Sequence, residues 1–157
     1  GYILDLYEAR VAIECEALRI ACLRAPEPDI AAFSDYLDRM EPDYESATEL
    51  EELLALDEGF HSRLVQLSGN RELQRMLKNL NGRIRYIRLI DLKRMRDQAE
   101  GRAPGDVSAH RQVLQRLAAR DVDAATNALR GHIEKRREEA TEAVRIAFSQ
   151  LYVPDED

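Results

Sequence analysis

The chain contains three histidines, and each lies on the apolar stripe of a predicted helix. They are His61, His110 and His132, and Asp57 lies one helical turn before the first of them. An unpaired buried carboxylate or imidazole is costly, so such groups are satisfied by hydrogen-bond partners or by a metal. Three imidazoles and one carboxylate form an ordinary ligand set for a divalent transition metal. The four residues together predict a metal site inside the protein.

Helical spacing is what turns these residues inward. His61 shares a stripe with Leu50, Leu54, Asp57 and Leu64, His110 shares one with Val107, Leu114 and Leu117, and His132 shares one with Ala125, Ala128 and Leu129. Any one histidine taken alone is more often a hydrogen-bonded core residue than a ligand. The combination is more specific, because every histidine faces inward and Asp57 can reach the same ion as His61.

The composition fits one soluble helical domain that spans residues 1–157. Seven glycines and five prolines are few helix breakers for a chain that is 45% hydrophobic and 34% charged. No apolar run approaches the ~18 residues that a membrane span needs, and no signal peptide is visible. Cys15 and Cys22, seven residues apart on one predicted helix, are too distant for a disulfide and are interpreted as core residues in a reducing compartment. We therefore expect a cytoplasmic protein.

The charge of the chain is acidic overall and unevenly distributed. A formal net charge of -7 disfavours nucleic-acid binding by this segment itself, because phosphate contacts need clustered Lys and Arg. Eight acidic residues and no Lys or Arg lie in 41–61, whereas six basic residues and one acid lie in 83–96. Helix faces that complement each other are the simplest interpretation. A subunit interface and an anion-attracting cavity are the alternatives.

Prolines, glycines and capping residues divide the chain into six predicted helices joined by short connections. The helices are expected over about Tyr2 to Arg24, from Pro28 to before Pro42, from Ser46 or Thr48 to Ser68, from Asn70 to about Gln98, from Asp106 or Ser108 to about Arg120, and from Asp121 to about Leu151. Ser46 and Thr48 are each followed three residues later by glutamate, the pattern of a capping box. Residues 100–105 are expected to form a loop, and the end of the chain from Pro154 an acidic tail. Short connections favour antiparallel neighbours, so the predicted fold is an all-α antiparallel bundle with a central cavity.

Three segments carry a resemblance to a known family. DEGFHSRLVQLSGNREL resembles the D-x-x-F-H-x-x-L…(S/G)-G-N-x-x-L signature of the FCD domain, the effector-binding C-terminal domain of GntR-type bacterial transcription regulators of the FadR group. AHRQVLQRLAARDVDAATNALRGHI is similar to the late histidine motif of that family, and YEARVAIECEALRIA resembles its Arg-x-x-(I/L)-Glu…Ala pattern, with Arg10 and Glu14 in the matching places. Two residues depart from the late motif: Ser108 replaces an acid and Arg116 an alanine. Neither replaces a ligand.

The resemblance implies a function as well as a fold. Many FCD domains hold a divalent metal in the cavity through one Asp and three His, and small carboxylate effectors bind there, often on the metal. Transferred residue by residue, the ligands are Asp57, His61, His110 and His132, the set that the stripes select. A DNA-binding winged helix-turn-helix would precede Gly1. The chain begins with GYILDLYEAR rather than methionine, which agrees with a further segment upstream. We expect the whole protein to bind operator DNA as a homodimer and not to associate with a membrane.

Two arginines are predicted to bind the carboxylate of the effector. Arg83 is placed on the apolar stripe of the fourth helix with Met76, Leu80 and Ile87, where an arginine needs an anionic partner. Arg10 is placed on a face with Glu14 and matches an arginine that the family often directs into its cavity. The alternatives are that each side chain extends to solvent or pairs with a neighbour such as Glu14.

The ligand set favours a sensor over a catalyst. Four protein ligands leave one or two positions of a five- or six-coordinate ion for water or a carboxylate. Zinc is the first choice, and nickel, manganese or iron are alternatives. A hydrolase would also need a general base, but Glu58 points away from the His61 stripe and no HExxH motif is present. We predict no catalytic residues. A helical-bundle metalloenzyme, hydrolytic or oxygen-using, and a helical interaction module with structural histidines are the competing hypotheses.

Overall fold

A computed structural model describes residues 1–99 and 107–151 of the chain. This part is all-α, with six helices and no strand among the described residues. The helices are α1 Tyr2–Arg24, α2 Glu27–Ser46, α3 Leu50–Gln66, α4 Arg71–Gln98, α5 Ser108–Ala118 and α6 Val122–Leu151. The predicted loop at 100–105 and the acidic tail lie outside the described residues.

The helix ends show which local signals are sufficient to place a boundary. Asn70 caps α4 as predicted, since its Oδ1 accepts hydrogen bonds from the backbone N–H groups of Glu72 and Leu73, each at 3.0 Å. Gly69 follows α3 with φ of 68°, the left-handed conformation that glycine adopts most easily. Asp121 caps the first turn of α6 by accepting from the N–H of Ala124 at 3.1 Å.

Two predicted boundaries around the second and third helices are wrong. Helix α2 continues through Pro42 to Ser46. The proline removes only the hydrogen bond to the Asp38 carbonyl, which belongs to an exposed residue that water can solvate. The extra turn buries Tyr44. Because Ser46 now ends α2, it cannot cap α3, which begins at Leu50 with no side-chain hydrogen bond from Glu49.

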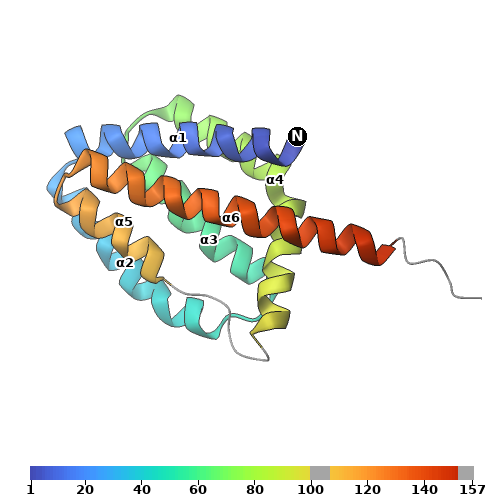
Figure 1. The fold of residues 1–157 in the computed structure, drawn as a ribbon. Coiled ribbons are helices and arrows are strands. Elements are labelled where there is room, and N and C mark those ends of the chain that lie inside the picture. The colour runs from blue at the N-terminus through green and yellow to red at the C-terminus, as the bar shows by residue number, and fades with distance from the viewer. Residues whose placement is uncertain (100–106, 152–157) are drawn as a thin grey trace, which may run out of the picture.

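The first and last helices form the centre of the bundle. Helices α1 and α6 lie side by side and antiparallel, and α1 packs more extensively against α6 than any other two helices pack (Figure 1). Helix α3 packs against α4, α5 packs against α6, and α2 covers α3 and α5. A continuous core fills the space between them, with fully buried Leu18, Leu37, Phe60, Leu117 and Leu129. The predicted antiparallel helical bundle is therefore confirmed.

The acidic and basic segments of the sequence pair with each other across the contact of α3 with α4. Arg85 of α4 pairs with Glu51 of α3, and Arg88 pairs with Asp57. These contacts agree with the interpretation that the two helix faces are complementary. Some of the acidic and basic residues of these two segments thus neutralise each other within the domain.

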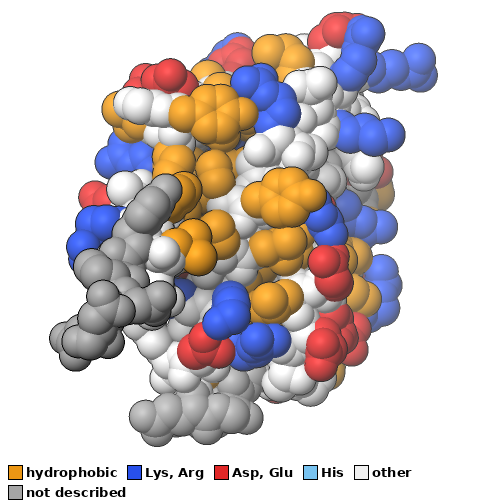
Figure 2. Space-filling model, turned by 90° about the vertical axis from the view of Figure 1, so that its right-hand side faces the viewer, with side chains coloured by type: hydrophobic (Ala, Val, Ile, Leu, Met, Phe, Trp, Pro, Cys, Tyr) orange, Lys and Arg blue, Asp and Glu red, His pale blue; other side chains and the backbone are white. Residues whose placement is uncertain are grey.

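The end of the molecule from which α6 emerges carries exposed hydrophobic side chains. Tyr2 and Leu4 of α1 and Phe148 and Leu151 of α6 are exposed, and Figure 2 shows hydrophobic side chains interspersed with charged ones on this side. The predicted homodimer stays a prediction. No helix of the described residues is long and apolar enough to cross a membrane.

Candidate metal and effector site

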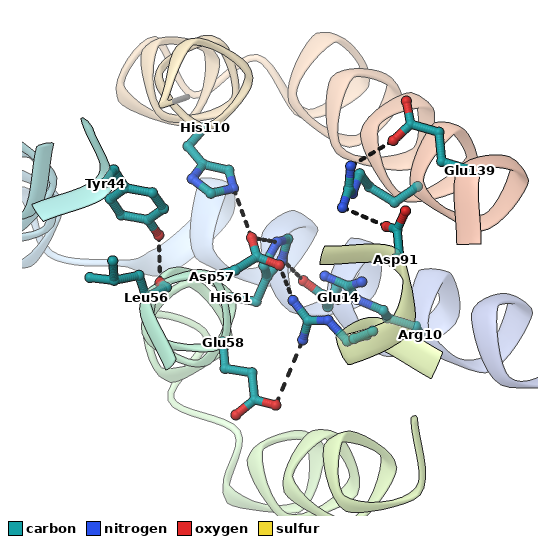
Figure 3. Close-up of polar contacts among 12 residues, drawn as sticks. Arg10, Glu14, Tyr44, Leu56, Asp57, Glu58, His61, Asp91, His110 and Glu139 are labelled. Carbon is teal, nitrogen blue, oxygen red and sulfur yellow. Dashed lines mark hydrogen bonds and ion pairs between the residues drawn. The ribbon is translucent and has the colours of Figure 1, made fainter. Parts of the chain in front are cut away.

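The four predicted ligands come together in the middle of the bundle. Asp57 and His61 project from α3, His110 from α5 and His132 from α6, and one ligand atom from each lies within 4.8 Å of the others. Asp57 Oδ1 lies 3.3 Å from His110 Nε2 and 3.6 Å from His61 Nε2. Three helices distant in sequence thus contribute to one small cluster, as Figure 3 shows for Asp57, His61 and His110.

A carboxylate on the far side of the ring orients His61. Glu14 of α1 accepts a short hydrogen bond from His61 Nδ1, and its other carboxylate oxygen accepts one from Arg10 Nε at 2.6 Å. Burial by itself would raise the pKa of Glu14, but His61 and Arg10 hold it well below its ordinary value. With Nδ1 protonated toward Glu14, the lone pair of His61 Nε2 points at Asp57. This arrangement of carboxylate and histidine is typical of metal ligands.

Aromatic packing orients the second histidine. The ring of His110 stacks on Phe60 with centroids 4.0 Å apart, and Tyr44 meets it edge-on at 5.7 Å. Tyr44 is itself fixed by a short hydrogen bond from its hydroxyl to the Leu56 carbonyl. His132 stacks on His61 with centroids 5.7 Å apart. His61 and His110 are therefore held by neighbours outside the cluster, whereas His132 packs on His61.

Burial keeps the three imidazoles neutral, the form that binds metals. Desolvation lowers the pKa of His61, and it lowers that of His110 well below the ordinary value. Desolvation and the neighbouring histidines lower the pKa of His132 to about 2. His61 Nε2 is buried and has no hydrogen-bond partner within the described part of the chain. A buried acceptor aimed at three other potential ligands is an arrangement that a bound cation satisfies, so these residues fit a divalent metal.

A buried arginine that the sequence did not single out binds the carboxylate of the cluster. Arg88 of α4 makes a short hydrogen bond to Asp57 Oδ2, and its Nη1 lies 3.9 Å from a carboxylate oxygen of Glu58. Burial lowers the pKa of Arg88 to about 9, so the guanidinium is still charged at neutral pH. Arg88 follows Ile84 by four residues, and Ile84 follows Leu80 by four. This helical spacing places Arg88 on the buried stripe and could have identified it from the sequence.

The two arginines proposed for the effector have different positions. Arg10 is buried, 2% exposed, next to the histidine cluster, where it binds Glu14. Arg83 is exposed on α4, so its predicted place on the buried stripe is wrong. The buried stripe consists of Leu77, Leu80, Ile84, Arg88 and Asp91. The structure does not bring Arg83 to the cluster.

A cavity of about 740 Å³ opens beside the cluster, between the end of α4, α5 and the middle of α6. His132 forms part of its wall, together with Arg94, Lys135 and Arg136. Pockets that bind small molecules commonly have volumes of roughly 300–1,000 Å³. The cavity therefore gives a small ligand access to one of the four predicted metal ligands.

Comparison with known proteins identifies the family of the chain. The family model described as FCD domain matches residues 5–135. The "Nta operon transcriptional regulator" of Aminobacter aminovorans is 35% identical over 155 residues, which cover 99% of this chain and 69% of that protein. The "Uncharacterized HTH-type transcriptional regulator YdhC" of Bacillus subtilis (strain 168) is 24% identical over 128 residues, 82% of this chain and 55% of that protein.

A solved structure shows the same fold. It is the "Crystal structure of transcriptional regulator (GntR family member) from Pseudomonas syringae pv. tomato str. DC3000", with a TM-score of 0.75 and 22% identity over 94% of this chain and 59% of that one. The curated relatives are regulators of transcription and not enzymes. Since the FCD match runs from residue 5 in α1 to residue 135 in α6 and the 35%-identical relative is a transcriptional regulator, the chain belongs to the FCD-domain family of transcriptional regulators.

Proposed function

We propose that this domain is the sensor of its regulator, binding one divalent metal and a small carboxylate effector. Asp57, His61, His110 and His132 hold the metal, which supplies a positive charge and open coordination positions for a carboxylate. Effector binding in turn modulates DNA binding by a winged helix-turn-helix domain outside this chain. Zinc is the first candidate, and nickel, manganese or iron suit the same nitrogen and oxygen ligands.

The observation that carries this proposal is the buried Nε2 of His61, which has no hydrogen-bond partner among the described residues, is positioned by Glu14 and faces Asp57. A structural core histidine would have its second nitrogen paired or exposed to water. Here the Nδ1 bond to Glu14 orients the ring, and the remaining nitrogen faces the other ligands. The arrangement supports a metal centre over a purely structural histidine cluster.

Arg10 is the remaining candidate for an effector arginine. Only its Nε is used for Glu14 in the described contacts, and it lies beside the histidines. We propose that it contributes positive charge to the cavity and supports His61 through Glu14. The acidic composition of the domain fits a protein that contacts operator DNA through another domain. We further propose that the whole protein is a homodimer in the cytoplasm.

Metal analysis tests the centre directly. Protein purified without chelators or metal-affinity steps is expected to contain about one equivalent of divalent metal per chain by elemental analysis. His132→Ala is expected to bind the metal much more weakly in a competition titration with a chromogenic chelator. Thr126→Ala, which removes a hydroxyl bonded only within α6, serves as the matched control. A metal-free wild type, or a His132→Ala variant with parental affinity, would contradict the proposal.

A further inference from the structure

The cavity beside the histidine cluster has a basic outer wall. Among the described side chains that line it, Arg94, Lys135 and Arg136 are cationic and Glu139 is the one carboxylate. The cations surround the same space that His132 borders. A small anion in this cavity would therefore meet positive charge at a place other than the metal.

Helical geometry places this charge one turn away from the cluster. On α6, Lys135 and Arg136 follow His132 by three and four residues, so the three side chains share a face. One turn rises about 5.4 Å along the axis, a distance similar to that between the two ends of a short dicarboxylic acid. The register of α6 thus presents a metal ligand and two cations along one line.

The carboxylate of Asp91 holds both cavity arginines, Arg94 and Arg136, in place. Arg136 contacts Asp91 at 2.6 Å and Glu139 at 2.6 Å, and Arg94 contacts the other oxygen of Asp91 at 3.2 Å. Asp91 is only 2% exposed, so it holds both guanidiniums from the interior side. Asp91 therefore limits how far the two arginines can move, as a preorganised anion site requires.

One cation on this wall has no ion-pair partner among the described residues. Lys135 is exposed and forms no ion pair with any residue that the structure describes. Gly131 also lines the cavity, and a Cβ added to it would meet nothing within 4 Å. Lys135 is thus a free donor at the cavity, and there is room for a ligand next to His132.

We propose that the effector carries two anionic groups, one bound at the metal and the second bound by Lys135 with Arg94 and Arg136. This inference rests on the proposed function, because the first anionic group is placed on the metal. The second group would accept charge-assisted hydrogen bonds, which are about twice as strong as neutral ones. Short dicarboxylates are the simplest compounds of this class.

Matched acids that differ only in the second carboxylate test the inference. The zinc-loaded chain is titrated calorimetrically with succinate and butyrate, which have equal carbon number, and with glutarate and pentanoate. Each dicarboxylate is expected to bind at least about tenfold more tightly than its partner, given the strength of hydrogen bonds to charged groups. Lys135→Gln is expected to weaken the dicarboxylates about three- to tenfold while leaving the monocarboxylates and the metal content unchanged.

Two further variants separate charge from shape. Lys78→Gln removes an exposed α4 lysine that lines a different groove, between α3 and α4, and is expected to change neither class of acid. Gly131→Leu fills the open space beside His132 and is expected to weaken the dicarboxylates. Neither variant removes an ion pair of Asp91.

The outcomes distinguish this inference from the proposed function. Equal affinity for mono- and dicarboxylates, or a Lys135→Gln variant that retains the parental preference, would overturn the inference and leave the metal-bound monocarboxylate standing. Failure of all four acids to bind the zinc-loaded chain would overturn the inference together with the effector part of the proposed function. Weakening of both classes by Lys135→Gln would assign the lysine to the first carboxylate and also overturn the inference.

Discussion

Glu14 connects α1 to the histidine cluster without being one of its predicted ligands. Its carboxylate bonds both His61 and Arg10 and is fully buried. Carboxylates in this position fix the orientation of a ligating imidazole and increase its basicity. Its effect on a metal is therefore expected to pass through His61.

Substitution of this carboxylate is expected to weaken metal binding without removing a ligand. Glu14→Gln keeps the shape of the side chain but loses the charge that polarises His61, so metal affinity is expected to fall about 10- to 100-fold. Competition titration with a chelator measures the change. Glu16→Gln, which alters an exposed carboxylate paired with Arg19 on the same helix, is the control. Parental affinity in Glu14→Gln would show that His61 needs no carboxylate partner.

The residues of the site could be predicted from the sequence in part. Asp57 and the three histidines can be found because polar residues on apolar stripes are conspicuous, and the structure brings all four together. The choice between Arg83 and Arg88 is not resolved by the sequence. Met76 and Ile87 extend one stripe of α4 while Ile84 and Leu92 extend another, and only packing against α3, α6 and α1 decides which stripe is buried.

At the scale of elements, the turn between α3 and α4 depends on one backbone conformation. Gly69 has φ of 68°, and a Cβ at this position would have no other atom within 4 Å, so the constraint there is conformational and not steric. A β-carbon in the left-handed region costs roughly 1–2 kcal/mol. The turn orients α4, which carries Arg88 toward Asp57.

Two glycine-to-alanine substitutions are expected to have opposite effects on stability. Gly69→Ala is expected to lower the free energy of unfolding by about 1 kcal/mol, because alanine is strained at that φ. Gly82→Ala, in an exposed and open position inside α4, is expected to raise it by up to about 1 kcal/mol through helix propensity. Urea denaturation gives both values. A stabilising Gly69→Ala would mean that the turn adopts another conformation in solution.

The helices themselves are predictable because their local signals agree with the final packing. Asn70, Gly69 and Asp121 mark boundaries through hydrogen bonds or conformations that involve only neighbouring residues. The end of α2 could not be predicted in this way. Pro42 is a local signal to stop, and burial of Tyr44 against residues of α3 and α5 outweighs it. Long-range burial of this kind is invisible in a short window of sequence.

For the whole molecule, the buried imidazoles link stability to pH. Their pKa values are lowered in the folded state, that of His132 to about 2, so below about pH 6.5 the unfolded chain binds more protons than the folded one. Stability is therefore complete above that pH and falls as the pH decreases. Folding also lowers the pKa of Glu14. This carboxylate therefore causes a further loss of stability when the pH falls below the ordinary pKa of glutamate.

Metal-free protein is expected to lose stability steadily between pH 6.5 and pH 5.5. Each imidazole that stays neutral in the fold lowers the free energy of unfolding by up to about 1.4 kcal/mol over one pH unit. Urea denaturation at pH 7.5, 6.5 and 5.5 measures the dependence. His132→Asn is expected to show a shallower dependence than the parent, and a flat profile in the parent would contradict the neutral assignment.

The pairing of α1 with α6 also has a consequence for synthesis on the ribosome. At roughly 5–20 residues per second, about 6–25 s separate translation of Arg24 from that of Leu151. Until α6 is translated, the face of α1 that packs against it has no native partner, and the nascent chain exposes apolar surface. Chaperones that shield such surfaces could bind α1 before α6 is made, and the cluster stays incomplete until His132 has been translated.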